Sequence, residues 1–133
     1  MASLEVEIVT QTAVAFQALA SEVSAPGFHG EFGVLPDHSP FLSVVIPGLV
    51  KITTDEGVVC FIVGRGFVEA GPRRVVLLTE SCEKPEGIDV KESTEQLEQA
   101  ERDLAAAEPN TGAWKDANHR AQMARARLAA SAL

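Results

Sequence analysis

The chain has 133 residues, of which 46% are hydrophobic and 23% charged, and its formal net charge is −8. These values predict a soluble globular protein of one domain, or of one small domain with an appendage. They disfavour nucleic acid and direct binding to anionic lipids, because an acidic surface repels phosphate groups. No apolar run approaches the roughly 20 residues of a membrane helix. Residues 1–7 lack the basic and apolar segments of a secretory signal or transit peptide.

The first part of the chain, residues 1–86, has the pattern of short strands separated by turns. Leu4, Val6 and Ile8 alternate with acidic residues, which is typical of a half-buried strand. Further apolar runs follow at 13–16, 18–23, 41–46, 49–53, 58–63, 67–70 and 75–79, separated by Gly- and Pro-containing turns. We therefore expect a flattened β-sandwich or barrel over residues 1–86.

The second part, residues 87–133, has the composition of helices. Asp89 and Glu92 have the spacing of a capping box and predict a helix over 90–108. The segment 108–112 contains Pro and Gly and ends that helix. A second helix is predicted over 113–132, with Asn110 or Thr111 as its N-cap. Two helices joined by so short a loop form an antiparallel hairpin.

The apolar stripes of both predicted helices are thin. They consist of Leu97, Ala100, Leu104 and Ala107 in the first helix, and Trp114, Ala117, Ala121, Ala124 and Leu128 in the second. Alanine buries little apolar area per residue, so we expect a marginally stable hairpin that needs the sandwich or a partner. Such an element can be moved by a ligand or a partner worth a few kcal/mol.

The sequence offers little for catalysis. We find no nucleophile paired with a base and no phosphate-binding loop of the Walker type, and we expect no metal or other cofactor. Gly64-Arg65-Gly66 is too short to hold phosphates and indicates a bulge or a close strand approach. Cys60 and Cys82 are expected to be reduced, packed thiols. A cupin-like enzyme using His29 and His38, with Glu31 and Asp37 nearby, is an alternative.

Residues 25–41 contain three glycines and three prolines between apolar side chains. On physical grounds this segment is either an ordered connection between strands or a rigid contact loop, and both interpretations stay open. Its core, GEFGVLPDHSP at residues 30–40, resembles the G-E-x-G-[VI]-L-P-x-H-x-P segment of ATP synthase epsilon subunits. Residues 63–70, VGRGFVEA, resemble the G-F-x-E strand of the same family, and the remaining elements fall in the family's order.

The resemblance implies a β-sandwich followed by a helical hairpin, with the sandwich seated on the gamma subunit and the c-ring. By motif position, Glu31 is expected to face the c-ring and His38 to lie near gamma. The full interface set implied by the motif is Gly30, Glu31, Gly33, Leu35, Pro36, His38 and Pro40. The hairpin is implied to switch between a state folded on the sandwich and an extended state.

In the extended state, basic residues of the second helix would meet acidic segments of the alpha/beta catalytic hexamer. The matching positions are Lys115, Arg120, Arg125 and Arg127. The family's ATP-binding pattern, I-D-x-x-R-A, is matched by Ile88 and Asp89, but Glu92 replaces its arginine. A carboxylate repels the phosphates of ATP, so we expect weak ATP binding or none.

The resemblance therefore predicts a non-catalytic central-stalk subunit of a proton-translocating F-type ATP synthase, which couples rotation to ATP synthesis and inhibits ATP hydrolysis through its C-terminal helices. A free-standing β-sandwich adaptor with a partner-binding hairpin is the alternative. We expect membrane association only through the complex, at the cytoplasmic face of a bacterial plasma membrane or the stromal face of a thylakoid. The sequence leaves open whether the coupling ion is a proton or sodium.

Overall fold

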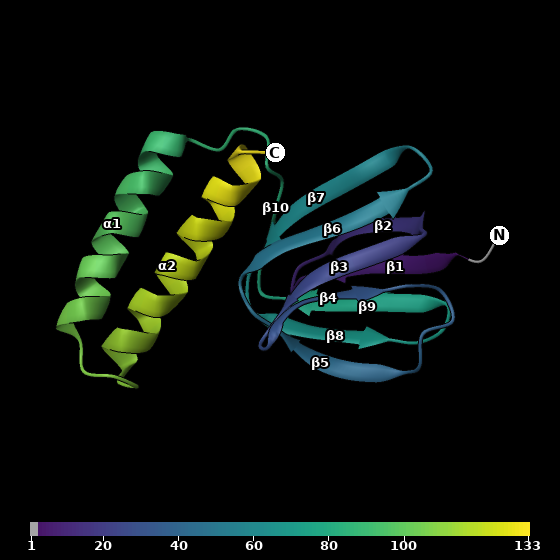
Figure 1. Cartoon of the computed structure of the whole chain (residues 1–133), viewed down its shortest axis with the longest axis horizontal. Helices are drawn as coiled ribbons and strands as arrows, with labels where there is room; N and C mark the ends of the chain where they lie inside the picture. Colours follow the sequence, from purple (N-terminus) through teal and green to yellow (C-terminus); the bar gives the residue numbers. More distant parts are fainter. Residues whose placement is uncertain (1–2) are drawn as a thin grey trace.

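The computed structural model describes residues 3–133, so residues 1 and 2 of the predicted first domain lie outside the described part. A β-sandwich is followed by two helices, as expected (Figure 1). The strands are β1 (Leu4–Val9), β2 (Val14–Ala20), β3 (Glu22–Gly27), β4 (Gly30–Val34), β5 (Phe41–Val45), β6 (Gly48–Thr54), β7 (Gly57–Val63), β8 (Gly66–Ala70), β9 (Arg74–Thr79) and β10 (Cys82–Glu83). The helices are α1 (Val90–Ala106) and α2 (Gly112–Ser131).

The strands form one strongly curved sheet that folds over on itself into a near-barrel. Its order is β10-β7-β6-β3-β5-β8-β9-β1-β2, and β4 pairs with β3. Most neighbours are antiparallel, whereas β1 and β9 run parallel. Leu4, Val6 and Ile8 are fully buried in the core, which confirms the alternation seen in the sequence. The charged residues between them point outward, as period-2 geometry requires.

Two boundaries in the first part differ from the prediction. The break between β2 and β3 falls at Ser21, whose backbone N–H donates to the carbonyl of Thr53 at 2.8 Å. Residues 25–41, expected to be either an ordered connection or a contact loop, also contain β4, which pairs with β3 in a tight hairpin. Gly30 makes this turn possible because its φ of +118° strains any residue with a side chain.

The predicted helices are present, and both caps are formed. Asp89 Oδ1 accepts a hydrogen bond from the backbone N–H of Glu92 at 3.0 Å, and Thr111 Oγ1 accepts from Trp114 at 3.3 Å. Asn110, the other predicted cap, instead adopts a left-handed φ of +66° in the connection. The first helix ends at Ala106, two residues before the predicted end. Among the described residues, no helix is long and apolar enough to span a membrane.

Helix α2 packs on strands β6 and β7 of the sandwich, and α1 packs on the side of α2 that faces away from the strands (Figure 1). Ala117, Ala121 and Ala124 are buried, consistent with the alanine stripe predicted for this helix. A second stripe of α2, Met123, Ala126 and Ala130, was not foreseen; it covers Ile62, with Leu49 and Ile88 at its edge. Ile62 alternates with core-facing Phe61 and Val63 on β7, so it points outward and is buried because α2 covers it.

The Gly64-Arg65-Gly66 segment marks a close strand approach, as predicted. A side chain at Gly66 would overlap the backbone carbonyl of Leu78 on the neighbouring strand β9. A side chain at Gly64 would lie 2.7 Å from Glu80 Cγ and 2.7 Å from Ser81 Oγ. These glycines therefore allow the turn before β8 to lie directly against the end of β9.

Candidate functional site

The segment with the family motif comprises strand β4 and the loop that connects it to β5. Glu31 and His38 are both exposed, and with Gly30 and Gly33 they line a shallow depression of about 410 Å³. His38 donates from Nδ1 to its neighbour's carbonyl, Ser39 O, at 2.7 Å and stacks edge-on against Phe41. The structure thus brings these four predicted interface residues together on one accessible surface.

The other predicted interface residues lie outside this depression. Leu35 and Pro40 are exposed in the loop that follows β4. Pro36 lines a separate hollow of about 640 Å³ together with Asp37 and Arg73. Asp37 adopts a φ of +69°, and its N–H donates to the carbonyl of Pro72 at 2.7 Å, which turns the chain at this point. The predicted set is therefore divided between two hollows, and Leu35 and Pro40 line neither of them.

The cupin-like alternative has no support in this geometry. His29 and His38 line the same depression as Glu31. Within residues 3–133, however, the structure contains no group of three His, Cys, Asp or Glu side chains able to hold a metal ion. His29 instead packs edge-on against the exposed ring of Phe28.

A second surface, which sequence analysis missed, is an exposed apolar row across four adjacent strands. Val44 on β5 pairs with Phe67 on β8, Phe67 pairs with Leu78 on β9, and Leu78 pairs with Val9 on β1. Val44, Phe67 and Leu78 are 47%, 52% and 48% exposed, and Leu42 beside them is 70% exposed. We name Val9, Leu42, Val44, Phe67 and Leu78 the apolar row. Aligned apolar side chains of this kind are typical of a contact surface.

The four predicted basic residues of α2 differ in their surroundings. Lys115 and Arg125 are exposed. Arg120 is bound within the hairpin, to Asp116 at 2.8 Å and to Asp103 of α1 at 3.0 Å. Arg127 reaches the sandwich, where Nε and Nη2 donate to the two carboxylate oxygens of Glu83 at 3.1 and 2.9 Å. Hydrogen bonding to Glu83 raises the pKa of Arg127 further above its already high value.

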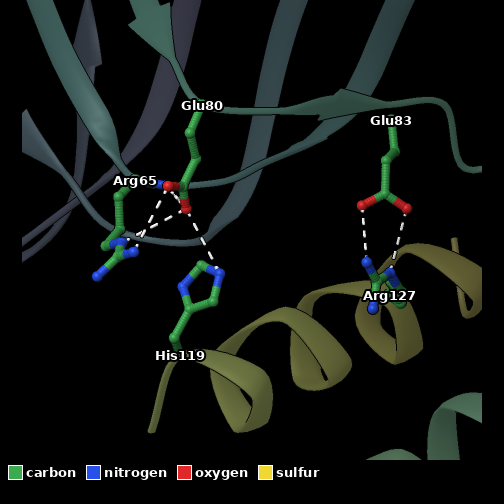
Figure 2. A network of polar contacts seen from close by, with 5 residues as sticks. All are labelled: Arg65, Glu80, Glu83, His119 and Arg127. Carbon is green, nitrogen blue, oxygen red and sulfur yellow. Dashed lines mark hydrogen bonds and ion pairs between the residues drawn. The ribbon is translucent and has the colours of Figure 1, made fainter. Parts of the chain in front are cut away.

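A polar network joins the base of the sandwich to α2 at a second point (Figure 2). Glu80, directly after β9, accepts hydrogen bonds from Arg65 and lies 3.4 Å from His119 Nε2. Burial works to raise the pKa of Glu80, but hydrogen bonds from Arg65 and the nearby charges of Arg65 and His119 lower it overall. Sequence patterns could not reveal this network, since its members come from three separate segments.

The position of the family's ATP motif is acidic in this chain. Asp89 and Glu92 line a hollow of about 310 Å³ between the linker and α1, together with Glu83, Glu86 and Arg127. Asp89 already caps α1, and Arg127 already binds Glu83. A ligand that enters this hollow therefore meets four carboxylates, which repel phosphate groups. Of the cations in the lining, Arg127 is already paired with Glu83.

These observations define the class of the protein, a β-sandwich with exposed contact surfaces and a C-terminal helical hairpin docked on its side. The family model for the β-sandwich domain of the ATP synthase delta/epsilon chain matches residues 3–85. The ATP synthase epsilon chain of Moorella thermoacetica is 41% identical over 113 residues, covering 82% of each chain. That of Desulforudis audaxviator is 39% identical over 108 residues, covering 81% of this chain and 79% of the relative. The chain belongs to the family of ATP synthase epsilon chains, which are non-catalytic subunits.

Solved structures agree on the fold. A chain in the Euglena gracilis mitochondrial ATP synthase, solved as OSCP/F1/c-ring, superposes with a TM-score of 0.84 at 19% identity, over 98% of this chain and 82% of that one. A chain in the central stalk/c-ring of the Tetrahymena thermophila mitochondrial ATP synthase gives 0.66 at 18% identity, over 96% of each chain. The likeness extends over the helices as well as the sandwich, since nearly the whole chain is covered.

Proposed function

We propose that the chain is a central-stalk subunit of a proton-translocating F-type ATP synthase, which couples rotation to ATP synthesis and restrains ATP hydrolysis through its helices. Residues 1–86 would dock on the stalk, and residues 87–133 would regulate. Membership of the epsilon-chain family and the central stalk/c-ring named for one structural neighbour support this proposal. The bacterial relatives favour the cytoplasmic face of a plasma membrane, with attachment through the complex.

The observation that carries the proposal is the apolar row. Phe67 lies near its middle and is half exposed, with Val44 and Leu78 directly opposite on the flanking strands. A parallel row of Glu69, Val76 and Glu7 borders it on the same face. An apolar centre with a charged edge is the usual composition of a protein interface. We assign this face to gamma and the depression with Glu31 and His38 to the polar loops of the c-ring.

Docking can be tested by co-purification with gamma. Burying a Phe side chain contributes about 1.5–3 kcal/mol, so Phe67→Ser is expected to weaken gamma binding by about ten-fold or more. Val58→Ser is the matched control, because Val58 is 65% exposed at the β6–β7 turn, outside the apolar row. Equal binding by the Phe67 variant and the wild-type chain would rule out this face.

Regulation can be tested in the assembled complex. Truncation after Gly87 removes both helices and leaves every strand of the sandwich in place. We expect the truncated chain to support assembly and ATP hydrolysis by the complex to rise. Neutralising Arg120, Arg125 and Arg127 together is expected to give part of that rise, and less at high salt, because exposed charge pairs are screened over roughly 8–10 Å. Unchanged hydrolysis after truncation would leave the hairpin a structural brace.

A further inference from the structure

Strand β7 is paired along only part of one of its two edges. On one side, β6 pairs with it over its whole length. On the other side, β10 pairs with it through Cys82, opposite Val63, and Glu83, opposite Ile62. Beyond Glu83 the chain leaves the sheet. Within residues 3–133, the stretch 57–61 of β7 therefore has no strand on this second edge.

The backbone groups that face the open edge are those of Val58 and Cys60. In an antiparallel pair, successive residues direct their N–H and C=O groups alternately to the two sides of the strand. The Gly64 N–H donates to the carbonyl of Ser81 at 3.1 Å, on the β10 side, so Cys60 and Val58 face that side as well. The two-residue turn between β6 and β7 requires the same alternation. Val58 and Cys60 thus each present an N–H and a C=O that no strand of the described chain binds.

A groove of about 990 Å³ lies beside this open edge. It is lined by residues 58–61 of β7, by Phe16 of β2, and by Ala130 and Leu133 at the C-terminal end of α2, which lies beside β7 and β10 (Figure 1). The rings of Phe16 and Phe61 are 4.9 Å apart and make one wall apolar. Unpaired backbone groups beside an apolar wall are the arrangement that binds an extended peptide as an added strand.

The charged part of the groove is more basic than acidic. Lys51 of β6 lies directly opposite Cys60, and Lys84 follows β10. Within residues 3–133 neither lysine forms an ion pair. Glu86 is the carboxylate side chain in the lining, so two cations face one anion. This balance favours a ligand that brings a carboxylate of its own.

The linker that follows β10 is unsuited to fill the edge. If the register of β10 continued, Pro85 would lie opposite Cys60. Proline has no N–H to donate to the Cys60 carbonyl, so the ladder stops there. Pro85 instead lines the groove, which leaves the edge open to another chain.

We propose that the open edge of β7 binds an extended segment of a partner protein as an added antiparallel strand in line with β10, with a Glu opposite Cys60 and an apolar residue on each side of that Glu. The Glu would lie on the sheet face of Lys51, about 10 Å away at about 4.8 Å per strand, within the joint reach of the two side chains. The flanking apolar side chains, opposite Val59 and Phe61, would point toward Phe16.

This site goes beyond the proposed function. The faces assigned to gamma and to the c-ring lie on other strands, so its test is independent of theirs. A bound segment would touch Ala130 and Leu133 as well as β7, and would therefore connect the sandwich to the end of α2.

The test uses the acetylated peptide Val-Glu-Val-Thr-Thr, titrated into the isotope-labelled full chain and followed by NMR. Exchange of individual backbone amides with water shows where the peptide binds. At a peptide concentration about five times the dissociation constant, the Cys60 amide should exchange about six-fold more slowly, because about one-sixth of the chain stays free. The amides of Val59 and Phe61, which already face β6, should keep their rates and serve as internal controls.

The chemistry of the segment is tested by exchanging charges. Lys51→Glu should weaken binding of this peptide by about two- to ten-fold and strengthen binding of Val-Lys-Val-Thr-Thr, because it reverses a partly exposed ion pair. Lys91→Glu is the matched control, since it makes the same charge change at an exposed position on α1, outside the groove, and should alter neither affinity. N-methylation of the peptide's Glu removes the N–H expected to bind the Cys60 carbonyl and should weaken binding by about five-fold or more.

Three results would overturn the proposal. The first is an unchanged Cys60 exchange rate up to about 5 mM peptide. The second is equal slowing at Cys60, Val59 and Phe61, which would indicate general stabilisation in place of strand addition. The third is protection of the Cys60 amide that grows with chain concentration in the absence of peptide, which would assign the edge to a second copy of this chain.

Discussion

Ile62 allows two free energies to be measured separately: that of α2 docking on the sandwich and that of unfolding the sandwich itself. The Ile62 side chain is fully buried, yet it lies on the outer face of β7 in contact with Met123, Ala126 and Ala130. Ile62→Ala therefore removes apolar contact with the helix and leaves the inner core of Phe61 and Val63 intact.

The magnitude follows from the carbon atoms removed. Replacing Ile by Ala deletes three carbons, worth about 2.4 kcal/mol at about 0.8 kcal/mol each. A residual cavity raises the cost to about 4 kcal/mol where the surroundings cannot relax. Because α2 can shift at this surface contact, we expect the lower figure, about 2–2.5 kcal/mol, in the full chain.

The measurement compares Ile62→Ala in two backgrounds by denaturant unfolding and by energy transfer between the sandwich and α1. In the full chain, the docked fraction should fall strongly. In a chain truncated after Gly87, Ile62 is a solvent-exposed residue, and its replacement should change the free energy of unfolding by less than about 0.5 kcal/mol. Equal destabilisation in both backgrounds would show that Ile62 supports the sandwich itself and would refute the reasoning.

Three further predictions concern other parts of the chain. Calorimetry should give no ATP affinity tighter than about 1 mM, while Glu92→Arg should tighten it by removing a repulsive carboxylate; low-micromolar binding by the wild-type chain would contradict this. Gly66→Ala should destabilise the sandwich by about 1–3 kcal/mol or more in thermal unfolding, because its methyl group would overlap the Leu78 carbonyl, whereas Gly71→Ala, at an open position, should not. Burial raises the pKa of both Cys60 and Cys82, so their alkylation at about pH 7.5 should be slower than that of glutathione until the chain unfolds, and equal rates would count against packed thiols.

The sequence predicted those features that depend on local pattern. Leu4, Val6 and Ile8 alternate with charged residues and are buried accordingly. The Asp89 cap follows from side chains within a few residues of each other, and α1 ends within two residues of the predicted position. Turn and cap chemistry act over three or four residues, so such features can be recognised without knowing the fold.

Features that depend on sheet register could not be predicted in this way. The apolar row takes one residue from each of four strands and a second one from β5, and its members become neighbours when β1, β5, β8 and β9 are aligned. Each member alone is an ordinary exposed apolar residue. The same holds for the ion pair between Glu83 and Arg127, which are 44 residues apart. For β7, the apolar run at 58–63 predicted a strand but could not identify α2 as the cover of Ile62.

The pairing of the basic residues sets the order in which contacts would break in the proposed release of the hairpin. Of the four basic positions, Arg127 pairs with the sandwich, whereas Arg120 pairs within the hairpin, as far as the ion pairs of residues 3–133 show. If the hairpin leaves the sandwich as proposed, Arg127 loses Glu83 at that step, whereas Arg120 loses Asp103 only when the two helices separate. If acidic segments of a catalytic subunit receive these cations, Glu83 and Asp103 compete with them for the same groups. The carboxylates that hold the hairpin in its docked state would then be exchanged for a partner's, so release and capture depend on one set of charges.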